Sequence, residues 1–127
     1  MTATRVKVVS RKVSAHIVEA ERIVGHLAAL TGVVKPGIML GSTNVQHLAV
    51  YYPPRTYREY PNGVILMRRE APRQLINLVC HEFQHHLDAL AGTVCERPHS
   101  RHDYAFYARL AALEERYLAY RAATAAN

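Results

Sequence analysis

The sequence predicts a small α+β domain, and two kinds of pattern support this prediction. Apolar residues recur every three or four positions in three segments, which is the period of a helix with one buried face. Between the first and second of these segments lie three short apolar runs bounded by glycine or proline, which favours strands. The order helix, strands, helix, helix fits one domain over residues 1–127, and a chain of this length buries a core without disulfides.

The first helical pattern covers residues 14–31. Ser14 is a candidate N-cap, because its hydroxyl accepts a bond from a free N–H of the first turn. Gly32 ends the pattern, and residues 5–9 before it fit a short strand or a frayed tail. The apolar positions of this helix are Ile17, Ala20, Val24, Leu27 and Thr31.

Three strands are expected next, over residues 38–40, 47–52 and 64–67. The second run alternates in the period of a half-buried strand, and Pro53 and Pro54 stop it. Residues 60–63, Tyr-Pro-Asn-Gly, predict a turn before the third strand. Since only residues 68–71 separate that strand from the next helix, we expect it to be an exposed sheet edge that binds an extended peptide.

Two helices complete the domain. Pro72 suits the first turn of the second helix, where its missing N–H costs nothing, and Gly92 closes that helix. Ser100 is a candidate cap for the last helix, with Asp103 in its first turn. The expected buried positions are Leu75, Ile76, Val79, Phe83, Leu87 and Leu90 on the second helix and Phe106, Leu110, Leu113, Tyr117 and Tyr120 on the third.

The second helix carries the motif His81-Glu82-Phe83-Gln84-His85. Histidines four residues apart lie one helical turn apart on the same face, so both imidazoles reach one metal ion. Glu82 is rotated by about 100° from His81, so it lies beside the metal and takes a proton from water there as a general base. This pattern predicts a hydrolytic zinc site in which His81 and His85 are metal ligands and Glu82 is catalytic.

A catalytic zinc site needs a third protein ligand, and the downstream candidates are Glu96, His99, His102 and Asp103. We favour His102 because it lies four residues before Phe106 and so shares the buried stripe of the last helix. His99 lies in the preceding loop, where helical phase says nothing about its position, so it stays open as the alternative. Asp88 is either an exposed polar residue or a partner that orients a ligand imidazole, and His86 points to another face.

The order of elements and the residues His81, Glu82, His85, His102 and Phe106 resemble the SprT-like, or Spartan-type, zinc metallopeptidases. The resemblance covers about residues 14–122 by order of elements, and it implies a minimal zincin fold and cleavage of proteins, often coupled to DNA. Two features depart from that family. His102 is followed by Asp103 where glycine is usual, and the paired cysteines of a zinc ribbon are missing, which removes most of the ground for a DNA-linked role.

Composition indicates where the protein works and which kinds of partner it has. The chain has a formal net charge of +6, and no apolar run approaches the roughly 20 residues of a membrane helix. No secretory signal is recognisable, so we expect the cytoplasm and free thiols at Cys80 and Cys95. The basic charge and the aromatic and basic residues of segment 55–60 leave a nucleic-acid partner open.

The leading hypothesis is therefore a zinc-dependent metalloendopeptidase acting on a protein or peptide substrate. The alternative is a catalytically inactive zincin-fold module that recruits a protein or nucleic acid. A structural zinc site built on Cys95 and His99 lacks its other half, because Cys80 lies on the catalytic helix.

Overall fold

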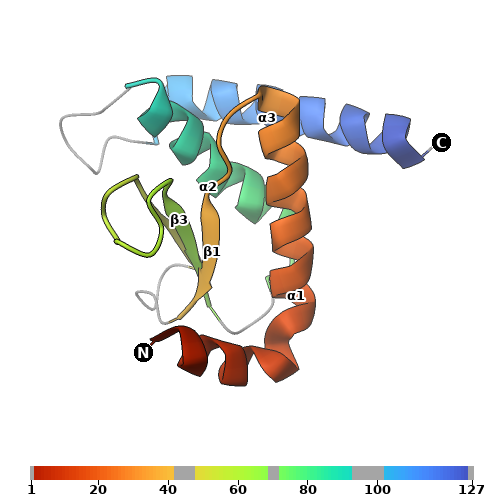
Figure 1. Ribbon diagram of the computed structural model, residues 1–127. Helices are drawn as coiled ribbons and strands as arrows, with labels where there is room; N and C mark the ends of the chain where they lie inside the picture. The colour runs from red at the N-terminus through yellow and green to blue at the C-terminus, as the bar shows by residue number, and fades with distance from the viewer. Residues whose placement is uncertain (1, 42–47, 69–71, 93–101, 126–127) are drawn as a thin grey trace.

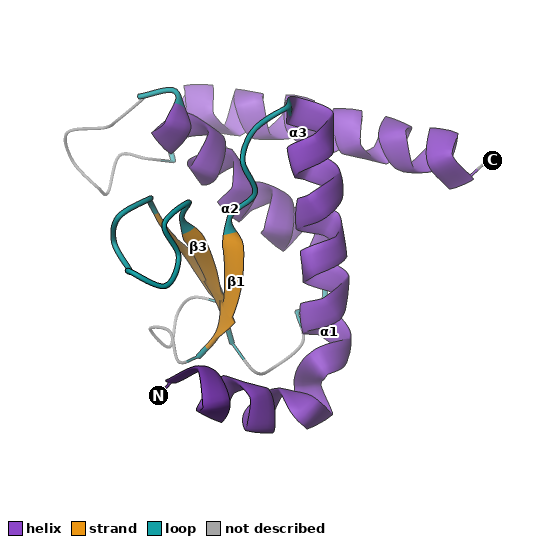
Figure 2. Cartoon of the chain, in the orientation of Figure 1, coloured by secondary structure: helices purple, strands orange, loops and turns teal. Residues whose placement is uncertain are grey.

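The computed structural model describes residues 2–41, 48–68, 72–92 and 102–125. They form three helices and a small three-stranded mixed sheet, which is the predicted α+β class (Figures 1 and 2). The elements are α1 (Thr2–Thr31), β1 (Gly37–Leu40), β2 (Ala49–Tyr52), β3 (Val64–Met67), α2 (Leu75–Leu90) and α3 (Tyr104–Ala125).

Helix α1 is longer than expected. It already begins at Thr2, so residues 5–9 are helical and Ser14 lies inside the helix instead of capping it. No glycine or proline interrupts residues 2–24, so nothing in the sequence breaks the helix there. Its end matches the prediction, because Gly32 takes a φ of 73° and its N–H reaches the carbonyl oxygen of Ala28 at 2.8 Å.

The sheet corrects the expectation for the third strand. The strand order is β1-β3-β2, with β1 parallel and β2 antiparallel to β3. Strand β3 has the predicted bounds, but it is central, all four of its residues are buried, and neighbours pair with both of its sides. Its position close to α2 in the sequence therefore does not make it an edge strand, and β1 and β2 are the edges.

The core lies between the sheet and the helices. Helix α1 packs on β1 and α2 packs on β2, while α3 crosses α2 and also contacts α1 (Figure 1). His16 on α1 hydrogen-bonds through Nε2 to the carbonyl oxygen of Arg68, 3.1 Å away, which ties α1 to the end of β3. The residues at the centre of the core are fully buried and include Ile23, Leu27, Ile65, Val79, Phe83, Phe106 and Tyr117.

Helix α2 begins at Leu75, three residues after Pro72, with Gln74 at the N-cap position and no side-chain cap. It ends as predicted, because Gly92 takes a φ of 76° and donates to the carbonyl oxygen of Ala89. Of its expected apolar face, Val79 and Phe83 are buried, whereas Leu90 is 41% exposed. On α3, Phe106, Leu110, Leu113 and Tyr117 form the predicted buried stripe.

Candidate metal centre

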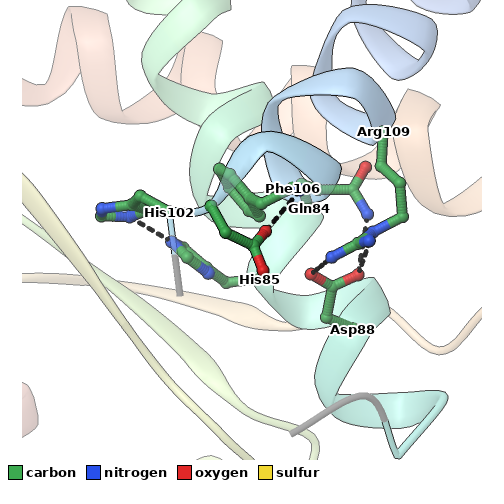
Figure 3. Close-up of polar contacts among 7 residues, drawn as sticks. Gln84, His85, Asp88, His102, Phe106 and Arg109 are labelled. Carbon is green, nitrogen blue, oxygen red and sulfur yellow. Dashed lines mark hydrogen bonds and ion pairs between the residues drawn. The ribbon is translucent and has the colours of Figure 1, made fainter. Parts of the chain in front are cut away.

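The imidazole rings of His81, His85 and His102 meet where α2 passes the start of α3, and Figure 3 shows two of them, His85 and His102. The Nε2 atom of His102 lies 3.1 Å from Nε2 of His81 and 3.0 Å from Nε2 of His85. The three nitrogen atoms lie within 4.8 Å of one another, which is close enough to hold one metal ion. Within the ranges that the structure describes, the only such group of histidine, cysteine or acidic residues is this one.

Helical geometry places two of these rings. His81 and His85 are one turn apart on α2, and their ring centroids are 5.1 Å apart. Both residues are half-buried, while Val79 and Phe83 on the opposite side of the helix enter the core. The motif therefore presents its two histidines at the edge of the core, as the spacing predicted.

His102 reaches the site by a different route from the one expected. It lies in the turn before α3, which begins only at Tyr104, so helical phase does not place it. A carboxylate oxygen of Asp103 accepts a hydrogen bond from the N–H of Phe106 at 2.8 Å, three residues on. Asp103 therefore caps α3 and fixes the backbone next to His102, whereas Ser100 lies outside the described residues.

Phe106 forms the apolar wall behind the three rings. Its side chain is fully buried, and its ring stacks on that of His85 with centroids 4.5 Å apart and planes 18° apart. The rings of His81 and His102 meet it at 5.1 and 5.2 Å. One aromatic side chain thus restricts all three imidazoles, and it lies on the helix that follows His102 (Figure 3).

The donor set fits a tetrahedral metal ion. Imidazole nitrogens at about 2.0–2.1 Å from zinc lie about 3.3 Å apart at the tetrahedral angle, close to the 3.0 and 3.1 Å seen here. Burial, and next the charge of His102, lowers the pKa of His81 to about 4. His81 is therefore neutral at physiological pH, as a metal-binding imidazole must be.

Glu82 follows His81 on α2 and is buried. Only 6% of its surface is exposed, and burial raises the pKa of its carboxyl to about 8, while a hydrogen bond from the backbone N–H of Tyr51 acts in the opposite direction. A pKa near neutrality suits a group that accepts and then returns a proton. A cation on the three histidines would lower this pKa, because an adjacent positive charge favours the carboxylate.

Asp88 does not orient a ligand imidazole through a contact of its own that the structure describes. Its carboxylate oxygens accept hydrogen bonds from Nε and an Nη atom of Arg109 at 3.1 and 2.8 Å, and Gln84 donates to it at 3.0 Å (Figure 3). Asp88 therefore links α2 to α3. Neither of the two alternatives left open for Asp88 included this link, because Arg109 lies 21 residues away and no local pattern points to it.

His86 points away from the metal ligands as expected, but its partner Tyr51 was not singled out from the sequence. His86 is fully buried, and its Nδ1 atom lies 2.8 Å from the hydroxyl oxygen of Tyr51 on β2. The alternation of β2 indicated that Tyr51 shares a face with Ala49, but nothing in the sequence aligns that face with α2. The open alternative His99, the candidates Glu96 and Cys95, and their loop lie outside the described residues.

No helix in the described part of the chain is both long and apolar enough to cross a membrane. Comparison with protein-family models, curated proteins and solved structures finds no match to this chain.

Proposed function

We propose that this chain is a zinc-dependent peptidase with a zincin-like fold, in which His81, His85 and His102 hold the metal and Glu82 is the general base. The observation that carries the proposal is the meeting of three imidazole nitrogens at helix α2, where the residue after His81, Glu82, is a buried acid. Structural zinc sites have four protein ligands, whereas three histidines leave a position open for water or substrate. Three imidazoles also favour zinc over the harder ions magnesium and calcium, which prefer oxygen.

When bound, zinc would supply a positive charge that polarises the scissile carbonyl and acidifies a coordinated water molecule. Glu82 would move the protons. A carboxylate oxygen of Glu82 accepts a proton from the attacking water, and the same oxygen then donates it to the nitrogen of the leaving amine. The oxygen of water forms the new C–O bond and the peptide C–N bond then breaks, so water supplies both the OH of the product acid and the hydrogen of the product amine, and no other reactant is needed.

The substrate would approach along β2. Because β3 is central, an added peptide strand has no place there, whereas β2 is an edge strand that packs against α2. The substrate would pair with those outward-facing main-chain groups of β2 that have no partner within the chain. Main-chain pairing is largely independent of side chains, so we expect a broad cleavage preference.

The test uses zinc-loaded protein and fluorescein-labelled casein as an unstructured substrate. Wild-type protein should release labelled peptides, and Glu82→Gln should bind zinc equally but lose at least about 99% of the activity, because an amide cannot accept the proton. Glu115→Gln is the matched control, since Glu115 is exposed on α3, and it should leave the rate unchanged. Zinc-loaded wild-type protein that cleaves no peptide would instead favour an inactive binding module.

A further inference from the structure

Tyr51 contacts the helix of the candidate site through its side chain. Its hydroxyl lies 2.8 Å from Nδ1 of His86, and Nε2 of His86 lies 2.7 Å from the carbonyl oxygen of Val34. Tyr51 is only 6% exposed and His86 is fully buried. The hydroxyl also lies close to the backbone of Gly63, the residue before β3. A Cβ atom added at Gly63 would lie 2.7 Å from the hydroxyl oxygen, so there is no room for a side chain there.

The carbonyl oxygen of Val34 decides which atom donates in each of these hydrogen bonds. A carbonyl oxygen can only accept, so Nε2 of His86 carries the hydrogen that bonds Val34. Full burial of His86 favours the neutral ring, in which Nδ1 then has a lone pair. The hydroxyl of Tyr51 is therefore the donor to Nδ1, and each polar atom of this chain of contacts has a partner.

The backbone of Tyr51 makes a second contact with the same helix. The N–H of Arg68 on the β3 side donates to the carbonyl oxygen of Leu48, so residues 48, 50 and 52 carry the bonds between β2 and β3. Tyr51 lies between these positions, and its N–H points away from β3. That N–H bonds the carboxylate of Glu82.

Tyr51 thus joins β2 to α2 by two hydrogen bonds. Its backbone N–H bonds Glu82, and its hydroxyl bonds His86, which lies four residues later on α2. We propose that Tyr51 is a positioning residue for the general base: its hydroxyl, anchored on His86, fixes β2 so that its N–H holds the Glu82 carboxylate in place beside the metal ligands. This inference rests on the proposed function. It deepens that function, because the burial of Glu82 alone leaves its carboxylate free to rotate about its side-chain bonds.

Tyr51→Phe tests the proposal, because it removes the hydroxyl and keeps the ring. In zinc-loaded protein acting on labelled casein, we expect kcat to fall about tenfold while KM and zinc content stay within twofold. In a Glu82→Ala background the same change should leave the residual rate unaltered, because Tyr51 acts through Glu82. His86→Gln breaks the anchor from the helix side and should lower kcat in the same way.

Tyr120→Phe is the matched control, since it is the same change on α3, where the ring of Tyr120 packs against that of His26 on α1. It should leave kcat unchanged. An unchanged kcat in Tyr51→Phe, or an equal loss in the Glu82→Ala background, overturns the positioning role.

A second readout does not need activity. The amide hydrogen of residue 51 should exchange with solvent faster in both Glu82→Ala and Tyr51→Phe than in wild type, because each change loosens the same bond. Unaltered exchange in Tyr51→Phe overturns the inference even if hydrolysis is found. If exchange at residue 51 is faster in both variants but the wild-type protein hydrolyses no peptide, the contact exists and the proposed function is wrong. Tyr51 then has no role in catalysis.

Discussion

The Nε2 atoms of His85 and His102 lie 3.0 Å apart, although the two residues are 17 positions apart in the chain. The first is held on the face of α2, and the second is held in a turn that Asp103 and Phe106 connect to α3. The metal centre therefore depends on the packing of α3 against α2 as much as on the motif itself.

Replacing His102 tests the third ligand. His102→Ala should weaken zinc binding by more than about 100-fold, because a bound ion loses one of three protein ligands. His99→Ala should change the affinity by less than about threefold, since His102 is the third histidine that the described part of the chain places with His81 and His85. Competition with a chelating dye gives both affinities, and the reverse order would assign the third ligand to His99.

Replacing Phe106 tests the aromatic wall. Phe106→Leu keeps an apolar side chain but loses the stacked contact with His85, so zinc affinity should fall about tenfold as the rings gain freedom. Phe83→Leu is the matched control, because Phe83 is also fully buried but enters the core from the other side of α2. Both variants should lose about 1 kcal/mol of unfolding free energy, so equal losses of zinc affinity would show that Phe106 has no special role.

The ion pair between Asp88 and Arg109 should matter for both stability and metal binding. Arg109→Met should lower the free energy of unfolding of the metal-free protein by about 1 kcal/mol, because a two-bond contact between α2 and α3 is lost and Asp88 is only 15% exposed at its side chain. The measurement is urea unfolding followed by circular dichroism.

The control is Arg22→Met, which removes an ion pair within α1 whose side chains are 49% and 41% exposed. It should cost less than about 0.5 kcal/mol. If Arg109→Met costs no more than Arg22→Met and leaves zinc affinity unchanged, the link between α2 and α3 does not support the site.

The metal-free protein should lose stability as pH rises because of Glu82. The folded-state pKa of Glu82 is raised to about 8 from an ordinary value of 4.5, so between these values the folded chain binds more protons than the unfolded chain. Unfolding free energy therefore falls with pH across that window, by on the order of 3 kcal/mol between pH 4.5 and pH 7.

Glu82→Gln isolates this effect. The variant should be as stable as wild type near pH 4.5 and progressively more stable up to about pH 8. His81 contributes the opposite trend, since its folded pKa of about 4 is depressed and stability is lost as pH falls below its ordinary value of 6.5. That contribution is common to both proteins and cancels in the difference, which is read from urea unfolding in chelator-treated buffer. If the difference in unfolding free energy between Glu82→Gln and wild type does not change with pH, the pKa of Glu82 is not raised in the folded protein.

Local patterns were enough to predict the elements that local chemistry controls. The bounds of β3 and the stripe from Phe106 to Tyr117 agree with the structure, and so do the glycine ends of α1 and α2. The pairing of His81 with His85 also followed from helical spacing alone. The start of α1 was misjudged because Ser14 fits a cap, although no residue before it opposes a helix.

Contacts between distant segments could not be predicted in the same way. The central place of β3 depends on pairing with strands on either side, and no residue of β3 encodes it. His102 was chosen because of its helical phase. It does lie with the other two histidines, but it does so from a turn that Asp103 organises and not from a helix. Asp88 with Arg109 and Tyr51 with His86 join segments 21 and 35 residues apart, and each became visible only when the helices and the sheet were placed together.

Zinc content and coordination test the central claim most directly. Protein purified with zinc present and then dialysed should retain one zinc per chain, and its X-ray absorption spectrum should show three imidazole nitrogens and one oxygen at about 2.0–2.1 Å. His102→Ala should show two imidazole nitrogens. Protein that retains no zinc, or a spectrum with sulfur or a fourth imidazole in the shell, would contradict an open site built from His81, His85 and His102.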